Sequence, residues 1–176
     1  DALPSQPTGL VLALADKLET LAGLFGLGQL PTGDRDPFAL RRHALGMIRM
    51  LIEPKLPLSL DALLRCAFGA FGGRVSDARE SLADFVFDRL AGWLRERGFS
   101  AQEVAAVVDQ RPDDLAAVPA RLQAVREFAG LPEAEALAAA TPRIGNILRK
   151  AEAGEAALAG LASGAGFDAA LLAEPA

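Results

Sequence analysis

Residues 10–55 constrain the possible folds more than any other stretch of this chain. Apolar residues recur there with the spacing of one helix face, first before and then after a run of closely placed glycines between positions 23 and 33. Glycine at this density favours a loop over a continuing helix. The stretch therefore predicts a hairpin of two apolar helices, over about 8–24 and 37–53.

Local signals account for the ends of these two helices. Thr8 is suited to the N-cap of the first helix. Asp36 is suited to the N-cap of the second, and Pro37 fits a first helical position, where no backbone donor is needed. Pro54 then ends the second helix. Because that helix is apolar nearly all round, we expect it to be mostly buried.

The remaining sequence predicts further helices and no strands, since no run shows the alternation of a half-buried strand. A boundary is expected at residues 111–118, which hold two aspartates and are flanked by prolines. We therefore predict an all-α fold with two parts, residues 1–110 and 111–176. The predicted helices are 59–71, 76–97, a short helix after the capping box Ser100–Glu103, 119–130, and an alanine-rich segment from Pro132.

Composition narrows the functional classes. The chain is 51% apolar, carries a net charge of −5 and has no tyrosine. A negative chain has no global attraction for nucleic acid, so any RNA contact must come from a local basic cluster. No apolar run is long enough to span a membrane, so we expect no membrane partner. The single cysteine, Cys66, fits a reducing cytoplasm.

The segment ALADKLETLAGLFGLGQLPTGDRDPFALRRHALGMIRM, residues 13–50, closely resembles the bacterial-type glycyl-tRNA synthetase β subunit. In that family a helix similar to ADKLDTL leads through a G-x-G-Q-x-P-x-G loop into DPFALRR. The resemblance implies an internal piece of a longer protein. It would contain the end of an HD-like helical region, linker helices, and the first part of a helical, DALR-like anticodon-binding domain.

The same resemblance implies an activity for the whole enzyme. An α₂β₂ glycine–tRNA ligase would use ATP to attach glycine to its tRNA in the cytoplasm. The α subunit would form glycyl-adenylate, and the β subunit would hold the glycine tRNA. This chain itself offers no catalytic residue, no phosphate loop and no cofactor site, so we expect it to contribute tRNA recognition and subunit scaffolding.

The segment TPRIGNILRK, residues 141–150, is similar to a stretch of the family that reads N-K-R-x-x-N-I-L-K-K. The resemblance makes Arg143, Asn146, Arg149 and Lys150 candidates for tRNA binding. A second interpretation stays open, in which these cations complement the dipole at a helix C-terminus.

Asp16 and Glu19 lie on the polar side of the first predicted helix, and we expect them to pair with Arg41 or Arg42 across the hairpin. The resemblance also places Asp16 where HD-type phosphohydrolases have their last metal ligand. Such a site needs several histidines, and the chain has only His43, so we predict no metal site. Two alternatives remain: a remnant of an HD-type phosphohydrolase, and a helical scaffold without an RNA role.

Overall fold

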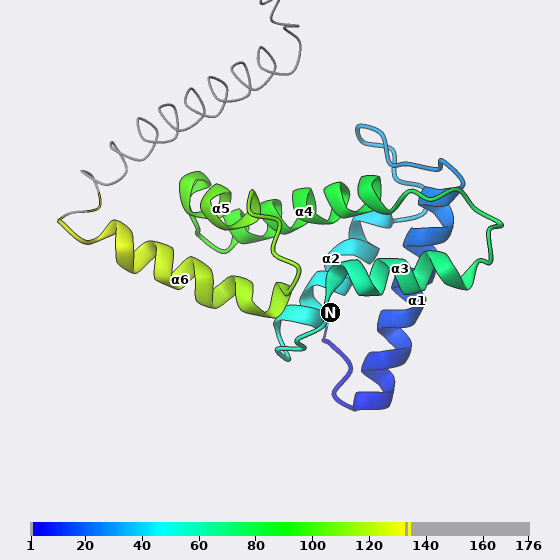
Figure 1. Cartoon of the computed structure of the whole chain (residues 1–176), viewed down its shortest axis with the longest axis horizontal. Coiled ribbons are helices and arrows are strands. Elements are labelled where there is room, and N and C mark those ends of the chain that lie inside the picture. The colour runs from blue at the N-terminus through cyan, green and yellow to red at the C-terminus, as the bar shows by residue number, and fades with distance from the viewer. Residues whose placement is uncertain (1, 133, 135–176) are drawn as a thin grey trace, which may run out of the picture. The chain divides into compact units, whose positions relative to one another are not determined.

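The computed structural model describes residues 2–132 and 134, and within them it is helical (Figure 1). The all-α prediction is confirmed, since the only β-type pairing in this range is two isolated bridges. The chain divides into two compact units, Asp1–Glu127 and Phe128–Ala176. The helices are α1 (Pro7–Gly26), α2 (Leu40–Ile52), α3 (Leu60–Ala70), α4 (Arg79–Glu96), α5 (Ala101–Val108), the 3₁₀ turn η1 (Leu115–Ala117) and α6 (Val118–Ala129), which crosses from the first unit into the second.

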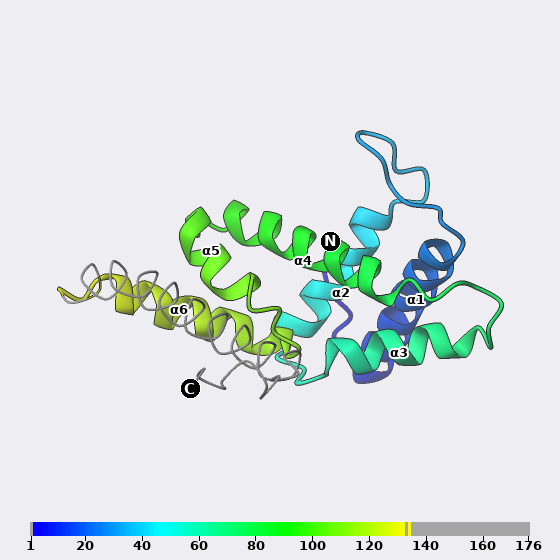
Figure 2. The same cartoon turned by 45° about the horizontal axis from the view of Figure 1, so that its top comes forward.

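Helix α2 lies at the centre of the first unit. It packs against α1, α4 and η1, and both views show it running between α1 and α4 (Figures 1 and 2). Seven of its thirteen residues are buried, among them Met47, Ile48 and Leu51 with no exposed surface. The prediction of a buried second helix is therefore confirmed. Burial of this apolar surface is the main force holding the unit together.

The start of α2 differs from the prediction. The helix begins at Leu40 because Ala39 adopts a left-handed conformation (φ 53°), which no helix interior allows. Asp36 still caps the backbone N–H groups at the start of the helix, although it lies four positions before the first helical residue. Its carboxylate accepts hydrogen bonds from the backbone N–H of Leu40 at 2.8 Å and of Arg41 at 3.0 Å. Asp36 thus supplies the predicted acceptor, but the N-cap position is Ala39 and the first helical residue is Leu40 and not Pro37.

Between α1 and α2 the chain forms an exposed loop whose tip is a tight hairpin. Thr32 and Arg35 exchange backbone hydrogen bonds of 3.0 and 2.8 Å, and Gly33, between them, has a positive φ of 49°. The loop stands clear of the helices in both views (Figures 1 and 2). No Cβ would clash at Gly33, so glycine is favoured there by its backbone conformation.

Helices α3 and α5 have the caps that the sequence predicts. The Ser59 hydroxyl accepts a hydrogen bond from the N–H of Ala62, and Ser100 and Glu103 form a reciprocal capping box. Helix α1 begins at Pro7 and its N-cap is Gln6, without a side-chain hydrogen bond, so the prediction of Thr8 as N-cap is wrong. Helix α4 starts three residues later than expected because the N–H of Ser76 bonds back to the end of α1.

The segment after α5 packs onto the same core. Leu115, Val118 and Leu122 are fully buried, and the segment also contacts the start of α3. There the carbonyl of Asp113 accepts from the N–H of Leu60 at 2.9 Å, and its carboxylate accepts from the N–H of Asp61 at 2.8 Å. The boundary between residues 110 and 111 stays a prediction.

Candidate nucleic-acid interface

Of the residues selected from the sequence, the basic cluster Arg143, Asn146, Arg149 and Lys150 lies outside the described residues. The structure therefore neither assembles nor separates it, and its role stays a prediction.

The hairpin ion pair is not formed in the structure. Asp16 and Glu19 are exposed on α1, and the ion pairs of the described residues join other side chains. Arg41 instead donates a hydrogen bond from Nη2 to the carbonyl oxygen of Gly33. Since both carboxylates face solvent, the burial that would have required a partner is absent.

Arg41 and Arg42 contribute to a different feature, a groove of about 260 Å³ between α2 and α4. We call it the arginine groove. Three arginines line it, against one carboxylate. Its lining residues are Arg41, Arg42 and Leu45 from α2, and Arg89, Gly92, Trp93 and Glu96 from α4.

The three guanidinium groups are held to different degrees. Arg41 is fixed by the Gly33 carbonyl, and Arg89 contacts the Asp88 carboxylate at 2.5 Å, with its guanidinium carbon 5.8 Å from the Phe85 ring centroid. Arg42 is exposed and takes part in none of the ion pairs of the described residues. The groove therefore has two positioned cations and one whose charge is available to a ligand.

Trp93 is covered rather than open at the edge of this groove. The Arg97 guanidinium stacks over its ring at 3.9 Å, and the indole is only 8% exposed. Arg97 also approaches Glu53 at 3.5 Å. A hydrogen bond from Arg49 to that carboxylate, at 2.7 Å, holds the pKa of Glu53 below its usual value. The ring of Trp93 is thus not free to stack on a base, and its arginines are what the groove offers to a ligand.

A second groove, of about 680 Å³, lies between α3 and α4 and has the opposite charge balance. Its floor is apolar, with Leu64 and Phe87, and its carboxylates outnumber its guanidinium groups. The charged lining residues are Asp61, Asp77, Glu80 and Asp113 against Arg79 and Arg111. This balance repels phosphate, so of the two grooves only the arginine groove suits nucleic acid.

Within the described part of the chain, no three His, Cys, Asp or Glu side chains lie close enough together to hold a metal ion. The helices there are too short or too polar to span a membrane. Asp16 in particular has no such companions among residues 2–132.

The fold and the groove together define an all-α domain that presents positive charge locally on a chain of negative net charge. Comparison with known proteins gives the family. The family model described as "Glycyl-tRNA synthetase beta subunit" matches residues 1–109. The chain therefore belongs to the glycyl-tRNA synthetase β subunit family, as its sequence motifs predict.

Individual relatives agree with this assignment. A protein named glycine–tRNA ligase β subunit from Leptothrix cholodnii is 64% identical over the whole chain, which corresponds to 24% of that relative. Its namesake from Acidovorax sp. (strain JS42) is 66% identical over 86% of the chain and 21% of the relative. A third, from Janthinobacterium sp. (strain Marseille), is 57% identical over the whole chain. The chain thus spans between a fifth and a quarter of the length of these relatives, whose designation as β subunits implies a complex with another subunit.

Sequence reasoning selected Arg41 and Arg42 but none of the other residues of the arginine groove, among them Arg89 and Trp93. Both fall on α4, more than forty positions after Arg42, and only the packing of α2 against α4 brings them together. The one signal in the sequence was the polar line formed by Arg42 and Arg49 on an otherwise apolar helix.

Proposed function

We propose that this chain is part of the β subunit of a glycine–tRNA ligase, an enzyme that uses ATP to attach glycine to its tRNA. The observation that carries the proposal is the 64% identity to a glycine–tRNA ligase β subunit along the entire chain. Within that enzyme the chain contributes tRNA recognition and subunit scaffolding, and the adenylate chemistry takes place elsewhere.

The family resemblance also suggests which subunit performs which step. An α subunit forms glycyl-adenylate from glycine and ATP, and the β subunit holds the tRNA, in an α₂β₂ assembly in the cytoplasm. The grooves of the described residues support a role in binding over one in catalysis. Their charged lining residues are arginines and carboxylates, and the others are apolar or glycine. The phosphohydrolase alternative is not favoured, because Asp16 lies exposed without companion ligands among residues 2–132.

The C-terminal part would supply contacts through the cluster Arg143, Asn146, Arg149 and Lys150. These residues match the family segment, and their cations suit RNA phosphates. Because the chain is negative overall, tRNA binding must depend on such local clusters.

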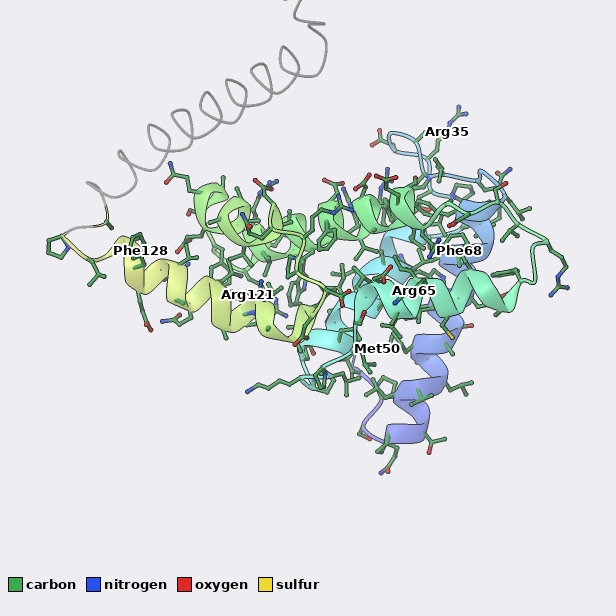
Figure 3. All side chains as sticks on the ribbon, viewed as in Figure 1. Arg35, Met50, Arg65, Phe68, Arg121 and Phe128 are labelled. Atoms are coloured by element: carbon green, nitrogen blue, oxygen red, sulfur yellow. The ribbon has the colours of Figure 1, made fainter. Side chains whose placement is uncertain are left out.

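The proposal is tested in the complete ligase with the double variant Arg149→Glu and Lys150→Glu. We expect a higher KM for glycine tRNA in aminoacylation and an unchanged rate of glycine-dependent pyrophosphate exchange, because exchange reports adenylate formation alone. Arg65→Glu, on α3, serves as the control for charge reversal (Figure 3). Absence of glycine charging by the wild-type ligase would refute the enzyme assignment. Unchanged charging by the double variant would favour the scaffold alternative.

A further inference from the structure

We propose that the arginine groove between α2 and α4 is a binding site for the phosphate backbone of the ligase's tRNA, separate from the cluster at residues 143–150. This inference rests on the proposed function, which supplies the RNA. The juxtaposition that carries it is Arg41 and Arg42 on one helix facing Arg89 on another.

Charge selects a phosphate ligand for this groove. Glu96 is the one carboxylate among the described lining residues, and Asp88, just outside the lining, pairs with Arg89. The positive charge open to a ligand is therefore mainly that of Arg41 and Arg42. Guanidinium groups bind phosphate oxygens in a two-pronged geometry and lose little hydration on doing so. Since Arg42 forms none of the ion pairs of the described range, an incoming phosphate would not have to displace a carboxylate from it.

The geometry of the groove supports binding by preorganisation. Arg41 is fixed to the loop between α1 and α2 through the carbonyl of Gly33, and Arg89 is held beside Asp88 and Phe85. Anchored cations lose less conformational entropy when a ligand binds than free side chains do. The two helices carrying them are packed on a common core, so their spacing is set before RNA arrives.

The exposed loop gives this site a further cation beside the groove. Arg35 is exposed at the hairpin tip, and Figure 3 shows its side chain on the outer part of the loop. Because Arg41 both lines the groove and donates a hydrogen bond to the Gly33 carbonyl, the middle of the loop lies at the edge of the groove. An RNA backbone lying in the groove would thus continue toward Arg35.

The observations favour RNA over a protein partner for this groove. A protein interface usually centres on exposed aromatic or aliphatic anchors. Here Trp93 is 8% exposed under Arg97, and Leu45 is only partly exposed. Four of the seven described lining residues are charged, and three of these are arginines, the side chains that most often contact phosphate.

The test uses the complete ligase carrying Arg42→Glu, with Arg42→Lys as the charge-conserving variant and Arg65→Glu as the control on α3. We expect Arg42→Glu to raise the KM for glycine tRNA roughly tenfold, the scale of one lost phosphate contact plus a new like charge. Pyrophosphate exchange should stay unchanged. In a plot of the logarithm of tRNA affinity against the logarithm of salt concentration, the slope should become less steep by about one unit. Arg42→Lys should keep the KM for glycine tRNA and the salt slope close to their wild-type values, and Arg65→Glu should leave both unchanged.

Each outcome decides the matter. If the wild-type ligase charges tRNA and Arg42→Glu leaves the KM and the salt slope unchanged, the groove proposal is wrong while the proposed function stands. If Arg42→Glu separates the β subunit from its partner on size-exclusion chromatography, the groove is a protein interface and the proposal is also wrong. Arg89 offers a second pair of variants, because Arg89→Lys keeps the positive charge near Asp88 and Arg89→Gln removes it. Normal tRNA affinity in Arg89→Lys together with reduced tRNA affinity in Arg89→Gln would support the proposal.

Discussion

Replacing Gly26 by alanine is expected to destabilise the first unit, although alanine favours helices. A Cβ at this position would lie 2.6 Å from the Cβ of Val75 and 2.9 Å from the carbonyl oxygen of Ser76. Ordinary contacts between carbon atoms are about 3.5–4.0 Å, so the neighbours would have to move by about 1 Å. They are not free to move, because the N–H of Ser76 donates a 3.0 Å hydrogen bond to the carbonyl of Gly26 itself.

The magnitude follows from two opposing terms. Overpacking of this kind costs about 1–3 kcal/mol. Replacing glycine by alanine within a helix returns up to about 1 kcal/mol. Gly69 provides the matched control, since it also lies in the last turn of a helix and a Cβ there meets nothing within 4 Å. We therefore expect Gly69→Ala to be stabilising by about 0.5–1 kcal/mol, and the two variants to differ by about 1–3 kcal/mol.

Urea unfolding followed by the fluorescence of Trp93 measures this difference. Trp93 is the only tryptophan of the chain and is buried in the first unit, so its emission reports the unfolding of that unit. If Gly26→Ala proved as stable as Gly69→Ala, the close packing of residues 75–76 on the end of α1 would be refuted.

Three further predictions concern stability in the same assay. Asp113→Ala should cost about 0.5–2 kcal/mol by removing the carboxylate that caps α3, whereas Asp113→Asn, which keeps an acceptor oxygen, should cost less. The Arg126 guanidinium, 2.6 Å from Glu103, holds the pKa of that carboxyl at about 2. Because this pKa lies below the ordinary 4.5, the pair stabilises the fold above that pH and loses its effect as the pH falls toward 2; the difference between wild type and Glu103→Gln should shrink over that range. Leu51→Ala, at a position with no exposed surface, should cost about 2–5 kcal/mol, while Leu12→Ala, where the side chain is 71% exposed, should be nearly neutral; equal effects would contradict the assigned core.

Local features of the fold could be predicted from the sequence because their causes are local. The Ser59 cap and the Ser100–Glu103 capping box depend on residues three positions apart, and both form as expected. Apolar residues occur nearly all round α2, and this pattern correctly predicted that the helix is buried on several sides. The first residue of α2 could not be predicted, since an alanine in a left-handed conformation has no sequence signature.

Features that depend on distant partners lay beyond the sequence. Asp113 caps α3 from 52 positions away, although its neighbourhood had the composition of a linker. The arginine groove likewise requires α2 and α4 to pack together. Arg41 and Arg42 were expected to serve as ion-pair partners within a hairpin. Helices α1 and α2 do pack together, but Asp16 and Glu19 face solvent, and the sequence spacing did not indicate that α4 also packs against α2.

We propose that this chain holds tRNA through local basic clusters within a glycine–tRNA ligase. The decisive measurement is equilibrium titration of glycine tRNA into the complete ligase, with Arg42→Glu, with the pair Arg149→Glu and Lys150→Glu, and with all three changes combined. If the groove and the distal cluster bind separate parts of the RNA, the combined loss of affinity should equal the product of the two separate losses. An affinity for the triple variant equal to that of the wild-type ligase, in an enzyme that still forms glycyl-adenylate, would contradict the claim.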